Sequence, residues 1–145
     1  MAKGLVGIVV VSHSNKLAEE IINFVEVLKN EDFSVENGGN SKSEVYGTNP
    51  GNVVEAIKRA DKGAGVLVFV DMGSSVYNAL EAKKILEKEI KVEIADAPLV
   101  EGIISAVASN FDDISLEELK EIAEDSRNFK REIRKKGKTP KGKGT

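Results

Sequence analysis

Hydrophobic and polar positions alternate along the chain in blocks that predict a succession of strands and helices. Continuous apolar runs at 5–11 and 65–70, rich in β-branched residues, indicate strands that are covered on both faces. Shorter segments at 33–35 and 92–95 indicate two further strands, of which the first has the weaker pattern. The stretch 37–51 is rich in Gly, Asn and Ser and is predicted to be mostly loop.

Between the apolar runs, hydrophobic residues recur every three or four positions, as they do on one face of a helix. This spacing predicts helices over 15–29, 50–60, 75–88 and 100–109 and a last helix that begins after Ser115. Ser14 or Asn15 is expected to cap the first helix and Asn49 the second, and Ser115 and Glu118 form a capping box. The residues expected to face the core are Leu17, Ile21, Phe24 and Leu28 in the first helix, Val76, Ala79, Leu80 and Leu86 in helix 75–88, and Leu116, Leu119 and Ile122 in the last.

Strands that alternate with helices predict a three-layer α/β fold with a parallel sheet. Right-handed crossovers place the second strand on one side of the first strand and a later strand on the other side. The first and third strands are therefore expected to be neighbours. Their carboxyl ends would form the crevice in which such sheets bind ligands.

Composition limits the chemistry that this fold can carry. The chain has 145 residues, enough for one domain, with no cysteine and one histidine, His13. Thiol chemistry, disulfides and cysteine-based zinc sites are excluded, and a lone histidine argues against a catalytic zinc. The first apolar run is too short to span a bilayer and has no cleavage pattern, so we expect a cytoplasmic protein without stable membrane insertion.

Charge is distributed unevenly. Residues 127–145 carry nine Lys or Arg and one Glu, whereas residues 1–126 carry 12 basic and 23 acidic side chains. We therefore divide the chain into a domain at 1–126 and a basic tail at 127–145, which is predicted to be disordered or to extend the last helix. Aromatic residues do not alternate with the basic ones and the domain is acidic, so no nucleic-acid partner is expected.

The candidate chemistry lies at the ends of the first and third strands. His13 follows the first strand, and Asp71 follows the third. A carboxylate that accepts a hydrogen bond from one imidazole nitrogen leaves the lone pair of the other free to attack an electrophile. Gly73 and Ser74 stand at a helix start, which favours an anion. Together these features predict a phosphohistidine site, although His13 alone could be a polar loop residue and Asp71–Ser74 a capped turn.

Four motifs occur in the order found in a known family. They are Val11-Ser12-His13-Ser14, Tyr46-Gly47-Thr48, Val70-Asp71-Met72-Gly73-Ser74 and Ala97-Pro98-Leu99-Val100-Glu101-Gly102. With these motifs the chain, over roughly residues 4–124, resembles the phosphotransfer subunits of bacterial dihydroxyacetone kinases. These subunits belong to the mannose-type IIA superfamily of the phosphoenolpyruvate:sugar phosphotransferase system (PTS).

The resemblance implies a four-stranded parallel sheet in the order 2-1-3-4, a possible antiparallel edge strand and a homodimer. It implies that His13 accepts a phosphoryl group from the phosphocarrier HPr, with phosphoenolpyruvate as the ultimate donor. The group would then pass to ADP bound by the nucleotide-binding kinase subunit, which phosphorylates dihydroxyacetone. Asp71 would orient His13, and Ser14, Gly73, Ser74 and Thr48 would bind the phosphoryl group. The intermediate is covalent, so neither a cofactor nor a metal is expected.

Some members of the family are fused to phosphocarrier and phosphoenolpyruvate-using domains. This chain ends before such domains, so separate carriers are expected. Three other functions are compatible with the residues. A mannose-type sugar IIA component would use the same histidine and pass the group to a IIB subunit, and a flavodoxin-like binding or regulatory module would use the loops without phosphotransfer. The third is a regulatory domain whose phosphorylation state is read by a transcription factor. Neither Gly-x-Gly-x-x-Gly nor Gly-x-x-x-x-Gly-Lys-[Ser/Thr] follows the first strand, which argues against a nucleotide-binding module.

Overall fold

A computed structural model describes residues 4–39, 49–131 and 133 of the chain. Within these residues, strands alternate with helices, as the hydrophobic pattern predicts. The strands are β1 (Gly7–Val11), β2 (Val35–Asn37), β3 (Val66–Val70) and β4 (Val92–Ala95). The helices are α1 (Asn15–Glu26), α2 (Pro50–Ala60), α3 (Ser74–Leu86), α4 (Leu99–Ser109) and α5 (Leu116–Asp125), and a 3-10 turn, η1 (Ser126–Asn128), follows α5.

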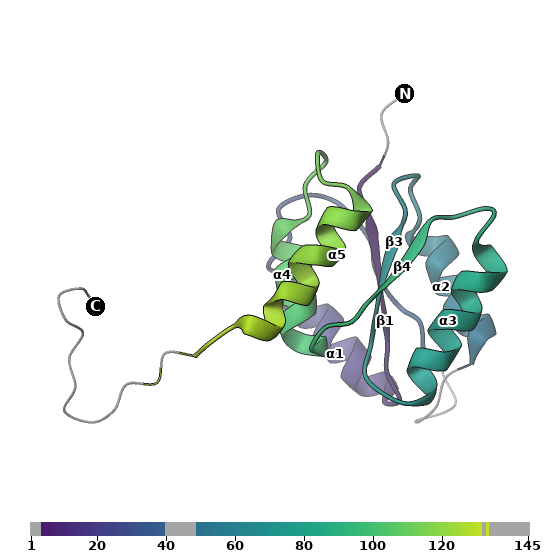
Figure 1. The fold of residues 1–145 in the computed structure, drawn as a ribbon, viewed down its shortest axis with the longest axis horizontal. Helices are drawn as coiled ribbons and strands as arrows, with labels where there is room; N and C mark the ends of the chain where they lie inside the picture. Colours follow the sequence, from purple (N-terminus) through teal and green to yellow (C-terminus); the bar gives the residue numbers. More distant parts are fainter. Residues whose placement is uncertain (1–3, 40–48, 132, 134–145) are drawn as a thin grey trace.

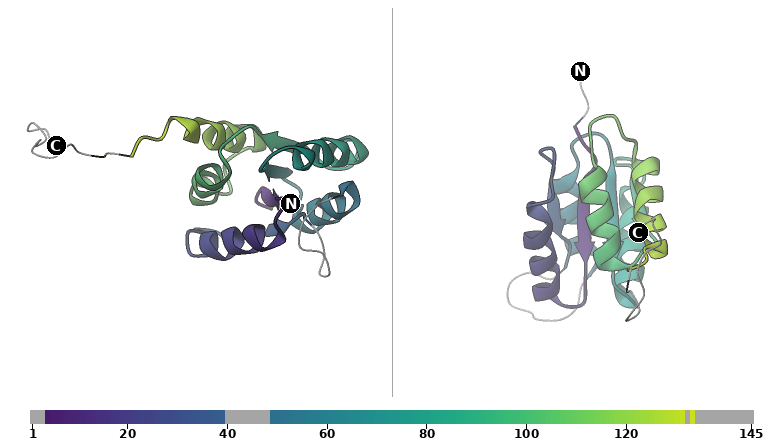
Figure 2. Two further views of the ribbon diagram at one scale, coloured as in Figure 1. Left: turned by 90° about the horizontal axis from the view of Figure 1, so that it is seen from below. Right: turned by 90° about the vertical axis from the view of Figure 1, so that its left-hand side faces the viewer.

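The strands form one parallel sheet in the order β2-β1-β3-β4, which confirms the predicted α/β class and strand order. Helices α1, α4 and α5 cover one face of the sheet, and α2 and α3 cover the other (Figure 1). The left view in Figure 2, seen from below, shows the same three layers. The register pairs Val11 with Val70, so β1 and β3 end side by side.

The two faces of the sheet build two separate hydrophobic cores. Ile8 and Val10 of β1 point into the core beneath α1, α4 and α5, and Val9 and Val11 point into the core beneath α2 and α3. All five residues of β1 are buried. The continuous apolar run in the sequence reflects this burial on both faces.

The predicted core face of α1 is partly wrong. Its buried residues are Ala18, Ile21 and Val25, whereas Leu17 and Phe24 are exposed. The spacing of the large apolar residues located the helix correctly but placed its inner face at the wrong angle. The pattern of large apolar residues passed over Ala18, a small residue that lies on the buried face of the helix.

The predicted core face of α3 is also partly wrong. Ala79 and Leu86 are buried as predicted, whereas Val76 and Leu80 are exposed. The buried face consists mainly of small residues at steps of four, three and four, namely Ser75, Ala79, Ala82 and Leu86, with Asn78 beside them. These side chains allow α3 to pack closely against the sheet and α2, so the larger residues point to solvent.

The strands also differ from the predicted pattern in two places. The second strand lies at Val35–Asn37 instead of 33–35, because its pairing with β1 begins where the Ile8 amide donates to the Ser34 carbonyl (2.9 Å). The resemblance also allows an antiparallel edge strand, but residues 111–114, between α4 and α5, form a turn in which the Ile114 amide donates to the Phe111 carbonyl (3.2 Å). Among the described residues the sheet therefore has four strands.

The helix caps follow the sequence. Ser14 accepts a hydrogen bond from the Leu17 amide, and Asn49 accepts one from the Asn52 amide. Ser115 and Glu118 form the predicted capping box. These side chains satisfy backbone N–H groups that have no partner inside the helix, which fixes where each helix begins.

The start of the basic segment contacts the domain. The guanidinium of Arg127 donates to the Asp96 carbonyl, and that of Arg131 pairs with the Glu101 carboxylate at 2.5 Å. Hydrogen bonding and the charge of Arg131 hold the pKa of Glu101 below its ordinary value. Most of the predicted tail lies outside the described residues, and no described helix is long and apolar enough to cross a membrane.

Candidate functional site

The candidate site forms where β1 and β3 end. The Asp71 amide donates to the Val11 carbonyl (3.2 Å), which extends the pairing of the two strands by one step. His13 lies between the end of β1 and Ser14, the N-cap of α1. Topology therefore brings the only histidine of the chain beside an aspartate that is 58 positions away in the sequence.

Asp71 holds both the backbone and the side chain of His13. One carboxylate oxygen, Oδ2, accepts the His13 backbone N–H at 2.9 Å. The other, Oδ1, lies 3.1 Å from imidazole Nδ1. Contacts at two points fix both the position of the residue and the direction of its ring.

Several hydrogen bonds keep Asp71 ionised. Burial by itself raises the pKa of this carboxyl, but hydrogen bonds from the His13 amide, the Ser75 side chain, the His13 ring and the Met72 amide together lower it to about 2. The Ser12 hydroxyl also donates to Oδ2 at 2.9 Å. A carboxylate can only accept, so the ring nitrogen that faces it, Nδ1, carries the proton.

The opposite ring nitrogen, Nε2, faces the start of α3. The Ser74 hydroxyl lies 2.9 Å from Nε2 and can donate to its lone pair. Gly73 is the N-cap and has φ +54°, ψ −123°, a backbone conformation that favours glycine. A Cβ there would lie 3.8 Å from His13 Cε1 and 4.0 Å from Nε2, so the glycine leaves the reactive edge of the ring open.

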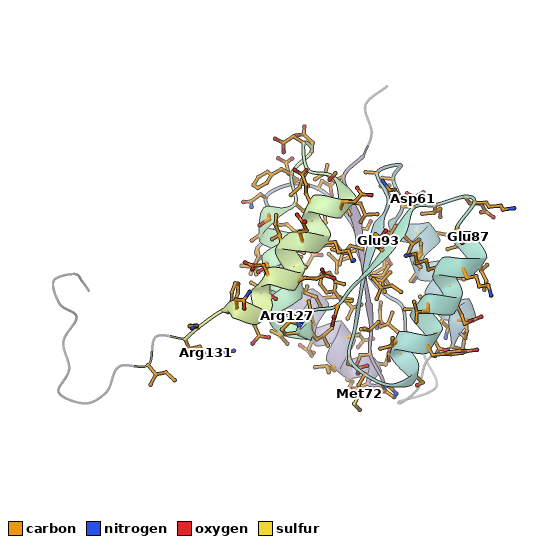
Figure 3. The ribbon with its side chains drawn as sticks, viewed as in Figure 1. Asp61, Met72, Glu87, Glu93, Arg127 and Arg131 are labelled. Carbon is orange, nitrogen blue, oxygen red and sulfur yellow. The ribbon has the colours of Figure 1, made fainter. Side chains whose placement is uncertain are left out.

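The site lies on the surface. The His13 side chain is 32% exposed, and that of Asp71 is 18% exposed. Met72, Val76 and Tyr77 are exposed around it. Figure 3 shows Met72 at one end of the sheet and Asp61 at the other. A depression lined by acidic residues, among them Asp61, Asp112 and Glu117, lies at the Asp61 end and contains no residue of the His13 site.

The sequence-predicted residues fall into three groups. His13, Asp71, Gly73 and Ser74 come together in space. The Ser14 hydroxyl caps α1 by accepting from the Leu17 amide at 3.1 Å. Thr48 lies outside the described residues.

Sequence reasoning missed the roles of two buried serines. Ser12 and Ser75 are both fully buried, and both side chains hydrogen-bond to Asp71. Ser12 also accepts the Ser14 amide at 3.0 Å. A signal for Ser75 was present, because its spacing from Ala79, Ala82 and Leu86 places it on the inner face of a helix.

The distances also match those of a Ser–His–Asp hydrolase, in the order Ser74, His13 and Asp71. Such enzymes need backbone N–H donors for the oxyanion, often from the residue after the nucleophile. Here the amide after Ser74, that of Ser75, donates to the Met72 carbonyl at 3.1 Å. The arrangement therefore favours His13, and not Ser74, as the nucleophile.

Within residues 4–39 and 49–131, no cluster of three or more His, Cys, Asp or Glu side chains is placed to hold a metal ion.

Comparisons with known proteins show the family to which the chain belongs. Residues 7–124 match the family EIIA-man, described as PTS system fructose IIA component. The phosphoryl donor subunit DhaM of the PEP-dependent dihydroxyacetone kinase of Escherichia coli K12 is 34% identical over 110 residues, which cover 72% of this chain and 23% of that protein. DhaM of dihydroxyacetone kinase 2 of Listeria innocua serovar 6a is 29% identical over 108 residues, which cover 73% of this chain and 86% of that protein.

Solved structures share the fold. A crystal structure of protein EF1359, of unknown function, has a TM-score of 0.69 and 27% identity, and the match covers 86% of this chain and 95% of that one. The PTS component EIIA of Streptococcus agalactiae has a TM-score of 0.60 and 17% identity, over 85% of this chain and 92% of that one. This second likeness concerns the fold alone.

The chain spans less than a quarter of the length of the Escherichia coli relative but most of the length of the Listeria one. The family match covers the whole sheet and all five helices except Asp125, the last residue of α5. The chain therefore belongs to the EIIA-man family of PTS components and, within it, resembles the DhaM subunits.

Proposed function

We propose that this protein is a phosphohistidine carrier that accepts a phosphoryl group on Nε2 of His13. The observation that carries the proposal is the pair of contacts on the ring. Asp71 lies at Nδ1, and the Ser74 hydroxyl lies at Nε2. This arrangement keeps Nε2 unprotonated at an exposed edge beside a helix N-terminus, and its lone pair becomes available when the Ser74 hydroxyl rotates away.

In the first step, the Nε2 lone pair attacks the phosphorus of the donor, the N–P bond of the donor breaks and a new Nε2–P bond forms. The ring keeps its proton on Nδ1 and becomes positively charged, and the Asp71 carboxylate stabilises this charge. Gly73, Ser74 and the start of α3 bind the phosphoryl oxygens. Ser14 and Thr48 stay predicted phosphoryl ligands, although Ser14 serves as a cap in the resting structure.

In the second step, an acceptor oxygen attacks the phosphorus and the Nε2–P bond breaks. Because Nδ1 is protonated, the ring leaves as neutral imidazole with its lone pair restored at Nε2. The site therefore returns to its starting state without a further proton. No cofactor is needed for this cycle.

We propose HPr as the donor and ADP bound to the dihydroxyacetone kinase as the acceptor. The names of the DhaM relatives support this acceptor, since they are described as phosphoryl donor subunits of that kinase. The proposal includes a homodimer in the cytoplasm. Light scattering on the purified chain tests the dimer.

Phosphorylation of the purified chain tests the carrier function. With phosphoenolpyruvate, the first PTS enzyme and HPr, the chain is expected to gain acid-labile, base-stable phosphate. His13→Ala should abolish the label. Asp71→Ala should slow labelling roughly 10- to 100-fold, the value of a hydrogen bond to a charged group, with an unchanged circular dichroism spectrum. An unlabelled wild type, or full labelling of His13→Ala, would refute the carrier.

The description of the family as a fructose IIA component favours a second candidate, a sugar-specific IIA protein. It would use the same histidine and differ in the acceptor. The labelled chain is therefore mixed separately with the ADP-loaded kinase subunit and with a sugar-specific IIB protein. Discharge to the kinase supports our proposal, and discharge to the IIB protein alone supports the second candidate.

A further inference from the structure

The Ser75 side chain occupies an unusual place in the first turn of α3. It is fully buried, and its Oγ lies 3.2 Å from His13 Nδ1. The same side chain hydrogen-bonds to Asp71. The inner face of the helix otherwise continues with Ala79 and Ala82, so an alanine would fit the packing at this position equally well. Buried hydroxyl groups need polar partners, and those of Ser75 are the two central residues of the site.

The hydroxyl of Ser75 has one proton and can donate it to only one partner. The Asp71 carboxylate is ionised, and a charged acceptor binds the proton more strongly than a neutral ring nitrogen. The lone pair of Ser75 Oγ is then directed toward Nδ1. This nitrogen has two acceptors within reach, the carboxylate at 3.1 Å and the hydroxyl at 3.2 Å.

The two acceptors discriminate between the two forms of the neutral ring. With the proton on Nδ1, every group in this triangle has a partner. With the proton on Nε2, the Nδ1 lone pair would face the carboxylate, and Ser74 could no longer donate to Nε2. A group held between acceptors on one side and a donor on the other is restricted to one tautomer and one orientation.

We propose that Ser75 is a positioning residue that fixes the Nδ1–H tautomer of His13 and thereby keeps the nucleophilic lone pair on Nε2. It acts through Nδ1 and Asp71 and does not touch the transferred group. Its effect on transfer rests on the proposed function, whereas its effect on the tautomer does not.

The tautomer can be measured directly because the chain has one histidine. In protein labelled with 15N-histidine, ring-nitrogen NMR of the resting wild type should show a protonated Nδ1 and an unprotonated Nε2. In Ser75→Ala the Asp71 carboxylate alone opposes the Nε2–H form, so the fraction of that tautomer should rise measurably above its wild-type value. Its rate of phosphorylation by HPr should fall about threefold to tenfold, as expected for loss of the neutral hydrogen bond between Nδ1 and the Ser75 hydroxyl.

Two variants separate hydrogen bonding from packing. The thiol of Ser75→Cys fills the space of the hydroxyl but is a weak hydrogen-bond donor and acceptor. This variant should therefore show the same tautomer and rate changes as Ser75→Ala. Ser126→Ala removes a hydroxyl that is 2% exposed and has no hydrogen-bond partner in the described structure, so it should leave both measurements unchanged. Thermal unfolding confirms that each variant folds.

An unchanged Nδ1–H tautomer in Ser75→Ala would overturn the proposal, and so would a Ser75→Cys variant with the wild-type tautomer. If wild-type protein is not phosphorylated at all, the carrier function fails while the NMR result still decides the role of Ser75.

Discussion

At the scale of single residues, one carboxylate organises the site. Asp71 accepts hydrogen bonds from the His13 amide, the Ser12 hydroxyl and the Met72 amide, at 2.9, 2.9 and 2.6 Å. These bonds join the end of β1 to the end of β3 and favour the charged form. The same residue that orients His13 therefore contributes to folding stability in a pH-dependent way.

We expect this contribution to disappear in acid. The pKa of Asp71 falls from 3.8 in the unfolded reference to about 2 in the fold, so its stabilisation is complete above pH 3.8 and is lost as the pH falls toward 2. Thermal unfolding of wild type and Asp71→Asn between pH 6 and pH 2 measures it. The difference in Tm should be largest at pH 6 and should shrink below pH 4. A difference that stays constant over this range would contradict the prediction.

At the scale of elements, the ends of strands and helices carry the chemistry, and the chain reverses direction there in short turns. The turn from β3 into α3 has only three residues, Asp71 to Gly73. Gly73 adopts a positive φ in it, and a Cβ would point at the open edge of the His13 ring. This glycine therefore has a conformational role and a role at the site.

A pair of glycine variants separates the two roles. Gly73→Ala should lower the free energy of unfolding by about 1–3 kcal/mol through backbone strain, and should also slow phosphorylation. Gly63 also has a positive φ, +104°, but a Cβ there meets nothing within 4 Å. Gly63→Ala should cost similar stability, measured by urea unfolding, and leave phosphorylation unchanged. Equal rates for the two variants would show that Gly73 matters only for folding.

At the scale of the whole molecule, the chain combines an acidic domain with a basic C-terminal segment. Residues 1–126 have a net charge of −11 and residues 127–145 one of +8. Encounters with a donor that has a basic docking face should be accelerated by the domain and hindered by the segment. Met72 and Tyr77, exposed beside His13, offer apolar surface for such a contact.

Salt should reveal this steering. The second-order rate of phosphorylation by HPr should fall roughly threefold to tenfold between low and high salt, because exposed charges are screened. A chain cut after Arg131 loses six Lys or Arg and one Glu, which lowers its net charge from −3 to −8. It should react faster than the full chain at low salt and equally fast at high salt. Slower reaction of the shortened chain would show that the segment assists the donor.

The sequence by itself determined the fold and the central pair of the site. Apolar runs locate strands that are buried on both faces, and capping residues fix helix starts, because both signals depend on neighbours in the chain. The crossover rule then places β1 beside β3, and with them His13 beside Asp71. The family motifs in the sequence point to the same site.

Only the tertiary structure decided which helix faces are buried and how the ring of His13 is held. Leu17, Phe24, Val76 and Leu80 are exposed although they are large and apolar, because the buried faces of α1 and α3 also include small residues such as Ala18, Ala79 and Ala82. Ser75 belongs to the site because of that same packing. The sizes of the apolar side chains in the sequence do not reveal how closely a helix approaches a sheet. Hydrogen bonds between residues that are distant in the sequence depend on that distance to within a few tenths of an ångström.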